Sequence, residues 1–201
     1  MPAMPRPALI LASTSRYRRE LLQRLRLPFE VVAPEVDETP QRGEAPAALA
    51  LRLARAKAQE VARRHPEAIV IGSDQVADLD GEPLGKPGTH ARAVTQLQRM
   101  SGRTLVFQTA VAVVCAARRF ERALLAPVRV SVRPLRPEEI EHYLQLEQPY
   151  DCAGSAKSET LGIALLSAIE SDDPTALVGL PLIRTCALLR EAGLDPLAPP
   201  P

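Results

Sequence analysis

Short apolar runs that are typical of buried strands alternate with amphipathic helical segments along this chain. Residues 68–71 form a continuous apolar run, as expected of a strand that is covered on both faces. Residues 46–64 instead carry apolar side chains at helical spacing. The hairpin signal Asp80-Gly81 indicates that antiparallel pairs are mixed into this alternation. The pattern predicts an α/β (mixed α+β) fold built on a mixed sheet, in one domain that a cleft could divide into two lobes.

The expected elements follow from these periodicities and from turn residues such as Pro and Gly. We expect strands at residues 9–11, 29–33, 68–71, 104–116, 124–134 and 163–169. We expect helices at residues 17–27, 46–64, 90–100, 137–147 and 181–192. The ends of the chain, residues 1–7 and 195–201, are expected to be flexible.

The composition limits the kinds of partner that this chain of 201 residues can have. Its formal net charge of +1 provides no broad field for nucleic acid or for an acidic membrane. Aromatic residues make up only 3% and Trp is absent, which argues against a surface on which single-stranded bases stack. No apolar stretch reaches the length of a membrane span. We therefore expect a small-molecule partner, with no nucleic acid and no membrane.

The three cysteines, Cys115, Cys152 and Cys186, lie far apart and have neither metal-site nor redox-motif spacing. The first residues show no usable signal-peptide pattern. Both observations favour a reducing, cytoplasmic location.

Hydroxyl and basic side chains gather directly after the first expected strand, and they are Ser13, Thr14, Ser15, Arg16, Arg18 and Arg19. Free backbone N–H groups at a helix start attract anions, and hydroxyl and guanidinium groups add further donors. The segment therefore suits phosphate. An ordinary strand-to-helix turn with solvated arginines explains the same residues equally well.

Acidic residues occur at two other places in the chain. Asp74 comes directly after the apolar run at residues 68–71, where a carboxylate can bind a metal or accept a proton from water. It can equally be a turn-forming Asp after Gly72 and Ser73. Glu38 belongs to a second acidic stretch, which a solvated loop would also explain.

Two lysines add candidate cations. Lys57 lies on the apolar stripe of its expected helix, four residues from both Leu53 and Val61, so its ammonium either reaches solvent or meets a phosphate in a cleft. Lys86 follows the hairpin signal in a turn with Gly85, and no Walker pattern is present. Cations with separated carboxylates are typical of a metal-dependent enzyme that acts on phosphate chains. This inventory favours an enzyme over a plain binding module.

The segments LASTSRYRRELL, VDE, IGSDQVADLDGEPLGKP, LQRMSGRT and VGLP resemble the Maf family of nucleoside triphosphate pyrophosphatases in order and spacing. The resemblance implies a domain at residues 8–194 with an elongated mixed α/β fold similar to that of inosine triphosphatase-type (Ham1) enzymes. It also implies a homodimer and a divalent cation, with Mg²⁺ as the first candidate and Mn²⁺ or Co²⁺ as alternatives.

Within the family, the chain is similar to the YceF-type subgroup, which is described as hydrolysing 7-methyl-GTP. The dTTP/UTP subgroup typically has Thr and Gln where this chain has Gln75 and Glu159. The resemblance implies site roles in four groups: Asp74 as proton acceptor; Ser13, Arg18, Arg19, Lys57 and Lys86 as phosphate ligands, the two lysines being catalytic; Glu38 with Asp74 as metal ligands; and Tyr17, Gln75 and Glu159 as specificity residues.

The implied reaction releases 7-methyl-GMP and diphosphate and removes modified nucleotides from the pool. A dTTP/UTP pyrophosphatase and a non-hydrolysing nucleotide-binding regulator of cell division are the alternatives. Two residues depart from the family pattern. Arg16 stands where Pro is usual, for which the sequence offers no physical account, and Ala110 stands where Gly is usual.

Overall fold

The structure, a computed structural model, describes residues 7–198 and contains a seven-stranded mixed sheet. The strand order is β2-β1-β3-β5-β6-β7, and β4 pairs with β3 off this path. The strands are β1 (Leu9–Ala12), β2 (Glu30–Val32), β3 (Ile69–Leu79), β4 (Glu82–Leu84), β5 (Thr104–Cys115), β6 (Phe120–Val132) and β7 (Leu166–Glu170). β1 pairs in parallel with β2 and β3, whereas the other pairs are antiparallel. This topology confirms the predicted mixed α/β class.

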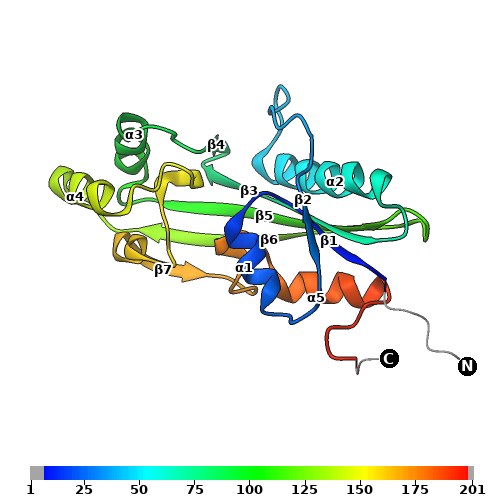
Figure 1. The fold of residues 1–201 in the computed structure, drawn as a ribbon. Coiled ribbons are helices and arrows are strands. Elements are labelled where there is room, and N and C mark those ends of the chain that lie inside the picture. The colour runs from blue at the N-terminus through cyan, green and yellow to red at the C-terminus, as the bar shows by residue number, and fades with distance from the viewer. Residues whose placement is uncertain (1–6, 199–201) are drawn as a thin grey trace, which may run out of the picture.

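The helices are α1 (Arg16–Gln23), α2 (Pro46–Arg64), α3 (His90–Met100), α4 (Pro137–Glu147) and α5 (Leu182–Glu191), with short 3₁₀ helices η1 (Ala153–Ser155), η2 (Leu161–Leu165) and η3 (Ala176–Val178). Figure 1 shows β3, β5 and β6 running along the length of the molecule. α2 covers one face of these strands, α1 and α5 lie on the other, and α3 and α4 lie at one end. The shape is elongated, as expected.

The most consequential difference from the sequence-based expectation is the length of β3. The polar residues Ser73 and Asp74 were expected to end the strand, yet β3 continues to Leu79. It continues because β5 supplies a partner throughout, with Asp74 opposite Ala110. Asp74 is therefore fixed in the middle of a strand and is not a residue of a turn.

Other expected boundaries shift for local reasons. α1 ends at Gln23, before a turn in which Arg26 has a left-handed φ of 54°. β6 begins at Phe120 because the pairing with β5 extends to Cys115. Residues 161–165 form η2, so β7 begins at Leu166. Residues 195–198 contain a turn, and the rest of the expected flexible ends, apart from Pro7, lies outside the described residues.

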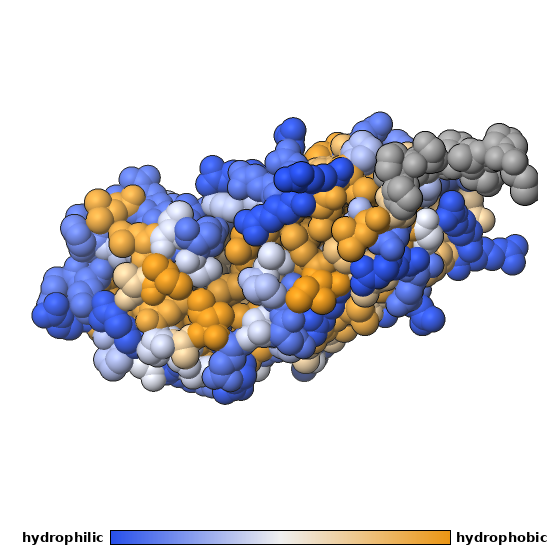
Figure 2. All heavy atoms as spheres, turned by 90° about the horizontal axis from the view of Figure 1, so that it is seen from below, coloured by the Kyte–Doolittle hydropathy of each residue, from blue (hydrophilic) through white to orange (hydrophobic). Residues whose placement is uncertain are grey.

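Apolar residues form a core on both faces of the long strands. Beneath α2, small side chains dominate the contact, including Ala54, Ala58 and Ala110. Ala110, which replaces the usual Gly, is fully buried there. The face in Figure 2 shows hydrophobic patches interspersed with hydrophilic side chains. In the described part of the chain, no helix has the length and apolar character needed to cross a membrane.

Gly72 on β3 permits the close approach of α2. A Cβ at this position would lie 2.2 Å from the Ala54 carbonyl oxygen and 2.6 Å from the Ala58 nitrogen. Both are backbone atoms and cannot rotate away. The approach matters because it brings Lys57, on the same helix face, next to Asp74 on the same strand.

We therefore expect Gly72→Ala to destabilise the protein by about 2–3 kcal/mol, because α2 must move away from β3. Urea unfolding followed by circular dichroism measures this change. Gly85→Ala is the control, since an added Cβ at Gly85 meets no atom within 4 Å. Equal midpoints for the two variants would contradict the proposed role of the close contact.

Candidate active site

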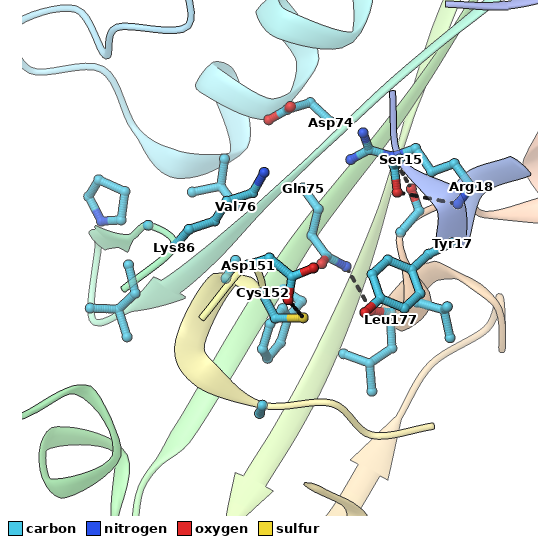
Figure 3. A pocket seen from close by; sticks show the side chains of 18 of the residues that line it. Ser15, Tyr17, Arg18, Asp74, Gln75, Val76, Lys86, Asp151, Cys152 and Leu177 are labelled. Atoms are coloured by element: carbon cyan, nitrogen blue, oxygen red, sulfur yellow. Dashed lines mark hydrogen bonds between the residues drawn. The ribbon is translucent and has the colours of Figure 1, made fainter. Parts of the chain in front are cut away.

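A cavity of about 870 Å³ lies where β1, α1, β3 and the loops after β4 and α4 meet. Of the predicted site residues, it is lined by Ser13, Tyr17, Arg18, Glu38, Lys57, Asp74, Gln75, Lys86 and Glu159. Figure 3 shows the ends of Arg18 and Lys86 directed toward the side of the cavity where Asp74 lies. Segments that are far apart in sequence thus bring cations and carboxylates together around one space.

Lys57 is the central charge of this site. Lys57 is only 5% exposed, and its Nζ lies 2.7 Å from Asp74 Oδ1 and 2.8 Å from Glu38 Oε1. A buried ammonium is costly unless it is paired, and here two carboxylates pair with it. The structure therefore excludes an ammonium that merely reaches solvent along an apolar helix face.

Glu38 is held by its surroundings in the ionised form. Partial burial would raise its pKa, but the hydrogen bond and charge of Lys57 outweigh that effect. Lys86 and Arg18 add smaller attractions, so the pKa of Glu38 lies below its ordinary value of 4.5. The positive charges of Lys57, Lys86 and Arg18 therefore all attract the Glu38 carboxylate.

The loop that carries Glu38 is anchored to α2 by Arg52. Arg52 Nε donates to Glu44 Oε1 at 2.6 Å, and its Nη2 donates to Glu44 Oε2 at 2.8 Å and to the Thr39 carbonyl at 3.1 Å. The Arg52 guanidinium, together with a bond from the Gln41 backbone, lowers the pKa of Glu44 to about 2. These bonds of Arg52 thus keep Thr39, which follows Glu38, close to α2, the helix that carries Lys57.

Arg18 enters the site from α1. Its Nε donates to the Gly179 carbonyl at 2.9 Å, and its Nη1 lies 3.5 Å from Ser13 Oγ. Burial lowers the pKa of Arg18, and the charges of Asp74 and Glu38 oppose this shift. Ser13, which is 3% exposed, also accepts a bond from the Ser15 backbone N–H, so the turn before α1 is ordered around its hydroxyl.

Arg19 is the one predicted phosphate ligand that the structure does not bring to the cavity. It is exposed and is not a lining residue. Arg18 and Arg19 are consecutive in a helix, so they point about 100° apart, and only Arg18 faces inward. The sequence-based assignment of both arginines is therefore not supported by the geometry for Arg19.

Gln75 presents its amide in one fixed direction. Its Nε2 lies 2.9 Å from Thr109 Oγ1, 3.0 Å from the Ala176 carbonyl and 2.9 Å from the Leu177 carbonyl. The Thr109 hydroxyl itself donates to the Ala176 carbonyl, so all three partners act as acceptors. The amide nitrogen must face them, which leaves the acceptor Oε1 of Gln75 for the cavity.

Tyr17 is held by Arg16, the residue for which the sequence offered no physical account. The guanidinium carbon of Arg16 lies 4.8 Å from the centre of the Tyr17 ring, and its Nη2 donates to the Tyr17 hydroxyl at 2.8 Å. Both residues line the cavity, so Arg16 gains a stacking role in place of the usual Pro.

The loop after α4 supplies the remaining wall of the cavity. Glu159 is exposed within it, and the Ser158 hydroxyl lies 3.4 Å from Glu159 Oε2. Burial raises the pKa of the neighbouring Cys152 thiol to about 12, and the charge of Asp151 adds to the shift. Cys152 therefore stays protonated and is unsuited to act as a nucleophile.

Sequence reasoning missed the role of Gly179 and its partners. The Gly179 carbonyl accepts from Arg18 Nε and, at 3.0 Å, from the fully buried Ser73 hydroxyl. Gly179 has a φ of 120°, which L side chains rarely adopt. The segment VGLP was recognisable in the sequence, but only the fold shows that its backbone positions Arg18.

The carboxylates fit a divalent cation only in part. Among residues 7–198, no group of three or more His, Cys, Asp or Glu side chains is arranged to hold a metal ion. Glu38 and Asp74 are the nearby pair, since both contact Lys57. Mg²⁺ usually takes one or two carboxylates together with substrate phosphates and water, so this pair suits a cation that arrives with a phosphorylated substrate.

Comparison with known proteins gives a consistent result. A family model described as Maf-like protein matches residues 8–192. A protein of Polaromonas sp. named 7-methyl-GTP pyrophosphatase is 69% identical over 92% of this chain and 85% of its own length. Proteins of the same name are 64% identical in Albidiferax ferrireducens, over 94% and 95%, and 58% identical in Bordetella avium, over 96% and 98%.

Among solved structures, one titled "Structure of a HAM1 protein from Coxiella burnetii" matches with a TM-score of 0.45 and 18% identity. The match covers 63% of this chain and 73% of that chain. No conclusion rests on so partial a likeness.

The low pKa of Glu38 predicts a pH dependence of stability. Because the folded state lowers this pKa, the ionised carboxylate stabilises the fold above pH 4.5, and this contribution is lost as the pH falls through the lower, folded value. We expect wild type to lose its advantage over Glu38→Gln between about pH 5 and pH 2. The effect is small, because the Glu38 side chain is 60% exposed and water screens it.

Urea unfolding at a series of pH values measures this difference, and Glu67→Gln is the control at an exposed carboxyl outside the cavity. A difference between wild type and Glu38→Gln that grows as the pH falls would contradict the account.

Proposed function

Since the chain belongs to the Maf-like protein family, we propose that it is a nucleoside triphosphate pyrophosphatase that hydrolyses 7-methyl-GTP to 7-methyl-GMP and diphosphate. The observation that carries the proposal is the ammonium of Lys57, buried between Asp74 and Glu38 at the wall of a cavity that Arg18 and Lys86 also line. The similar proteins of Polaromonas sp., Albidiferax ferrireducens and Bordetella avium, which match most of this chain, are named 7-methyl-GTP pyrophosphatase.

The cations of the cavity bind the triphosphate in this proposal. Arg18 offers a planar guanidinium that is already fixed through Nε to the Gly179 carbonyl. Lys57, from α2, and Lys86, from the loop after β4, supply two compact charges. Such preorganised charges stabilise the oxygens on which negative charge develops during phosphoryl transfer.

Asp74 is the proposed proton acceptor. Its carboxylate lies at the cavity wall, 6% exposed, and Lys57 Nζ donates a bond of 2.7 Å to its Oδ1. It takes a proton from a water molecule whose oxygen forms a bond to the α-phosphorus. The bond from that phosphorus to the bridging oxygen breaks, and diphosphate leaves with the electron pair.

A divalent cation belongs to the same proposal. Glu38 and Asp74 are the residues that would hold it, with Mg²⁺ as the first candidate and Mn²⁺ or Co²⁺ as alternatives. When bound, the cation neutralises phosphate charge.

Two acceptors define the proposed base specificity. Gln75 Oε1 and the Glu159 carboxylate both lack protons to donate. The guanine edge offers N1–H and N2–H donors, and methylation at N7 adds a positive charge that strengthens bonds to a carboxylate. A uracil or thymine edge offers one donor between two carbonyls, so it would leave an acceptor unpaired.

We expect Asp74→Asn to lower the rate of diphosphate release from 7-methyl-GTP with Mg²⁺ by at least about 10²-fold, because the amide cannot accept the proton. Asp78→Asn, on the same strand but outside this cavity, is the control and is expected to keep its activity. Near-normal turnover by Asp74→Asn would reject the proton-acceptor role. Nucleotide binding by wild type without any diphosphate release would instead favour the regulator.

Glu159→Gln is expected to reduce the preference for 7-methyl-GTP over UTP by about tenfold, because a charged acceptor for a cationic base is lost. The ratio of kcat/KM values for the two nucleotides measures this preference. Glu170→Gln, an exposed change on β7, is the matched control. Faster hydrolysis of dTTP or UTP by the wild-type chain would overturn the subgroup assignment.

A further inference from the structure

Gln96 on α3 lies between two loops that line different parts of the cavity. Its Nε2 donates to the Gly85 carbonyl at 2.9 Å, next to Lys86. Its Oε1 accepts a bond of 2.6 Å from the Ser155 hydroxyl, in the segment that leads to Glu159. One side-chain amide thus joins the lysine loop to the segment on the base side, and Gln96 itself does not line the cavity.

The Ser155 end of this bridge is tightly constrained. Ser155 is fully buried and has a left-handed φ of 56°, which is unusual for a residue with a side chain. Its carbonyl accepts from the Tyr143 hydroxyl at 3.2 Å, and its N–H donates to the Cys152 carbonyl at 3.2 Å. Without Gln96, the Ser155 hydroxyl would lose the partner that satisfies it in the interior.

A second connection runs in parallel with the first. The Gly88 N–H donates to the Tyr150 carbonyl at 3.0 Å, and His90 Nδ1 lies 3.0 Å from the Tyr150 hydroxyl. The loop of Lys86 and the segment before η1 therefore form one hydrogen-bonded unit. Within it, Gln96 contacts both Gly85, which precedes Lys86, and Ser155, which lies four residues before Glu159.

We propose that Gln96 is a positioning residue that couples the phosphate-side loop of Lys86 to the base-side segment of Glu159. The assignment rests on the proposed function, because Lys86 and Glu159 are its nucleotide ligands. Through this bridge, the placement of the base-side segment sets where Lys86 stands relative to the phosphate chain. Gln96 acts only through these two loops.

Gln96 donates one bond and accepts the other, so different substitutions can break each bond separately. Gln96→Glu keeps an acceptor for Ser155 but places a carboxylate oxygen against the Gly85 carbonyl, which repels it. Ser155→Ala removes the base-side bond and leaves the bond to Gly85 in place. Gln98→Glu is the matched control, since it makes the same change on the same helix at an exposed position.

Steady-state kinetics with 7-methyl-GTP and GTP form the first test. We expect Gln96→Glu to lower kcat about tenfold for both nucleotides, because Lys86 is displaced from the phosphates. We expect Ser155→Ala to raise KM several-fold for 7-methyl-GTP and less for GTP, because Glu159 is misplaced. Gln96→Glu kinetics equal to those of Gln98→Glu would overturn the proposal, as would equal effects of Ser155→Ala on both nucleotides.

Hydrogen–deuterium exchange without nucleotide is the second test, and it does not depend on which substrate is hydrolysed. Gln96→Ala removes both bonds and is expected to speed exchange about fivefold or more in residues 85–88 and also in residues 152–157, with Gln98→Ala, the same change at an exposed position of the helix, as its control. Faster exchange in only one of the two segments would overturn the coupling. A wild type that hydrolyses no nucleoside triphosphate would defeat the proposed function, while the exchange result would still decide whether Gln96 joins the loops.

Discussion

The site depends on one buried ammonium. Lys57 is 5% exposed, and its ammonium is paired in the interior with both Asp74 and Glu38. Removing either Lys57 or Asp74 from this buried pair would typically cost about 3–5 kcal/mol. Glu38 contributes less, because its side chain is 60% exposed. The arrangement also requires α2 to lie directly against β3, which Gly72 permits by having no side chain. The close packing of α2 on β3 is therefore also what brings Lys57 and Asp74 together in the site.

Backbone carbonyls do much of the remaining positioning. The η3 segment and Gly179 turn their carbonyl oxygens toward the site, where they hold the Gln75 amide and Nε of Arg18. These contacts join residues more than 100 positions apart in the sequence. Gln75 and Arg18 are thus each bonded to the scaffold at one group of the side chain and line the cavity with the rest. This is the preorganisation that binding a flexible triphosphate requires.

Local patterns in the sequence predicted most elements, because helical and strand periodicities are properties of a single segment. They failed at Asp74, since Gly, Ser and Asp in succession are typical of a turn, and only the partner strand β5 keeps them extended. They also gave Arg18 and Arg19 the same role, although the helical spacing places the two on different faces and only Arg18 lines the cavity. The role of Gln96 was not predictable, because its partners lie 11 and 59 residues away and neither contact leaves a periodic signal.

The central claim is that this cavity directs water to the α-phosphorus of 7-methyl-GTP. Hydrolysis by the wild-type chain with Mg²⁺ in water labelled with heavy oxygen, followed by mass spectrometry of both products, tests it most directly. The account predicts one labelled oxygen in 7-methyl-GMP and none in the diphosphate, because the new bond forms at the α-phosphorus. Label in the diphosphate, release of single phosphate groups, or no hydrolysis would contradict it.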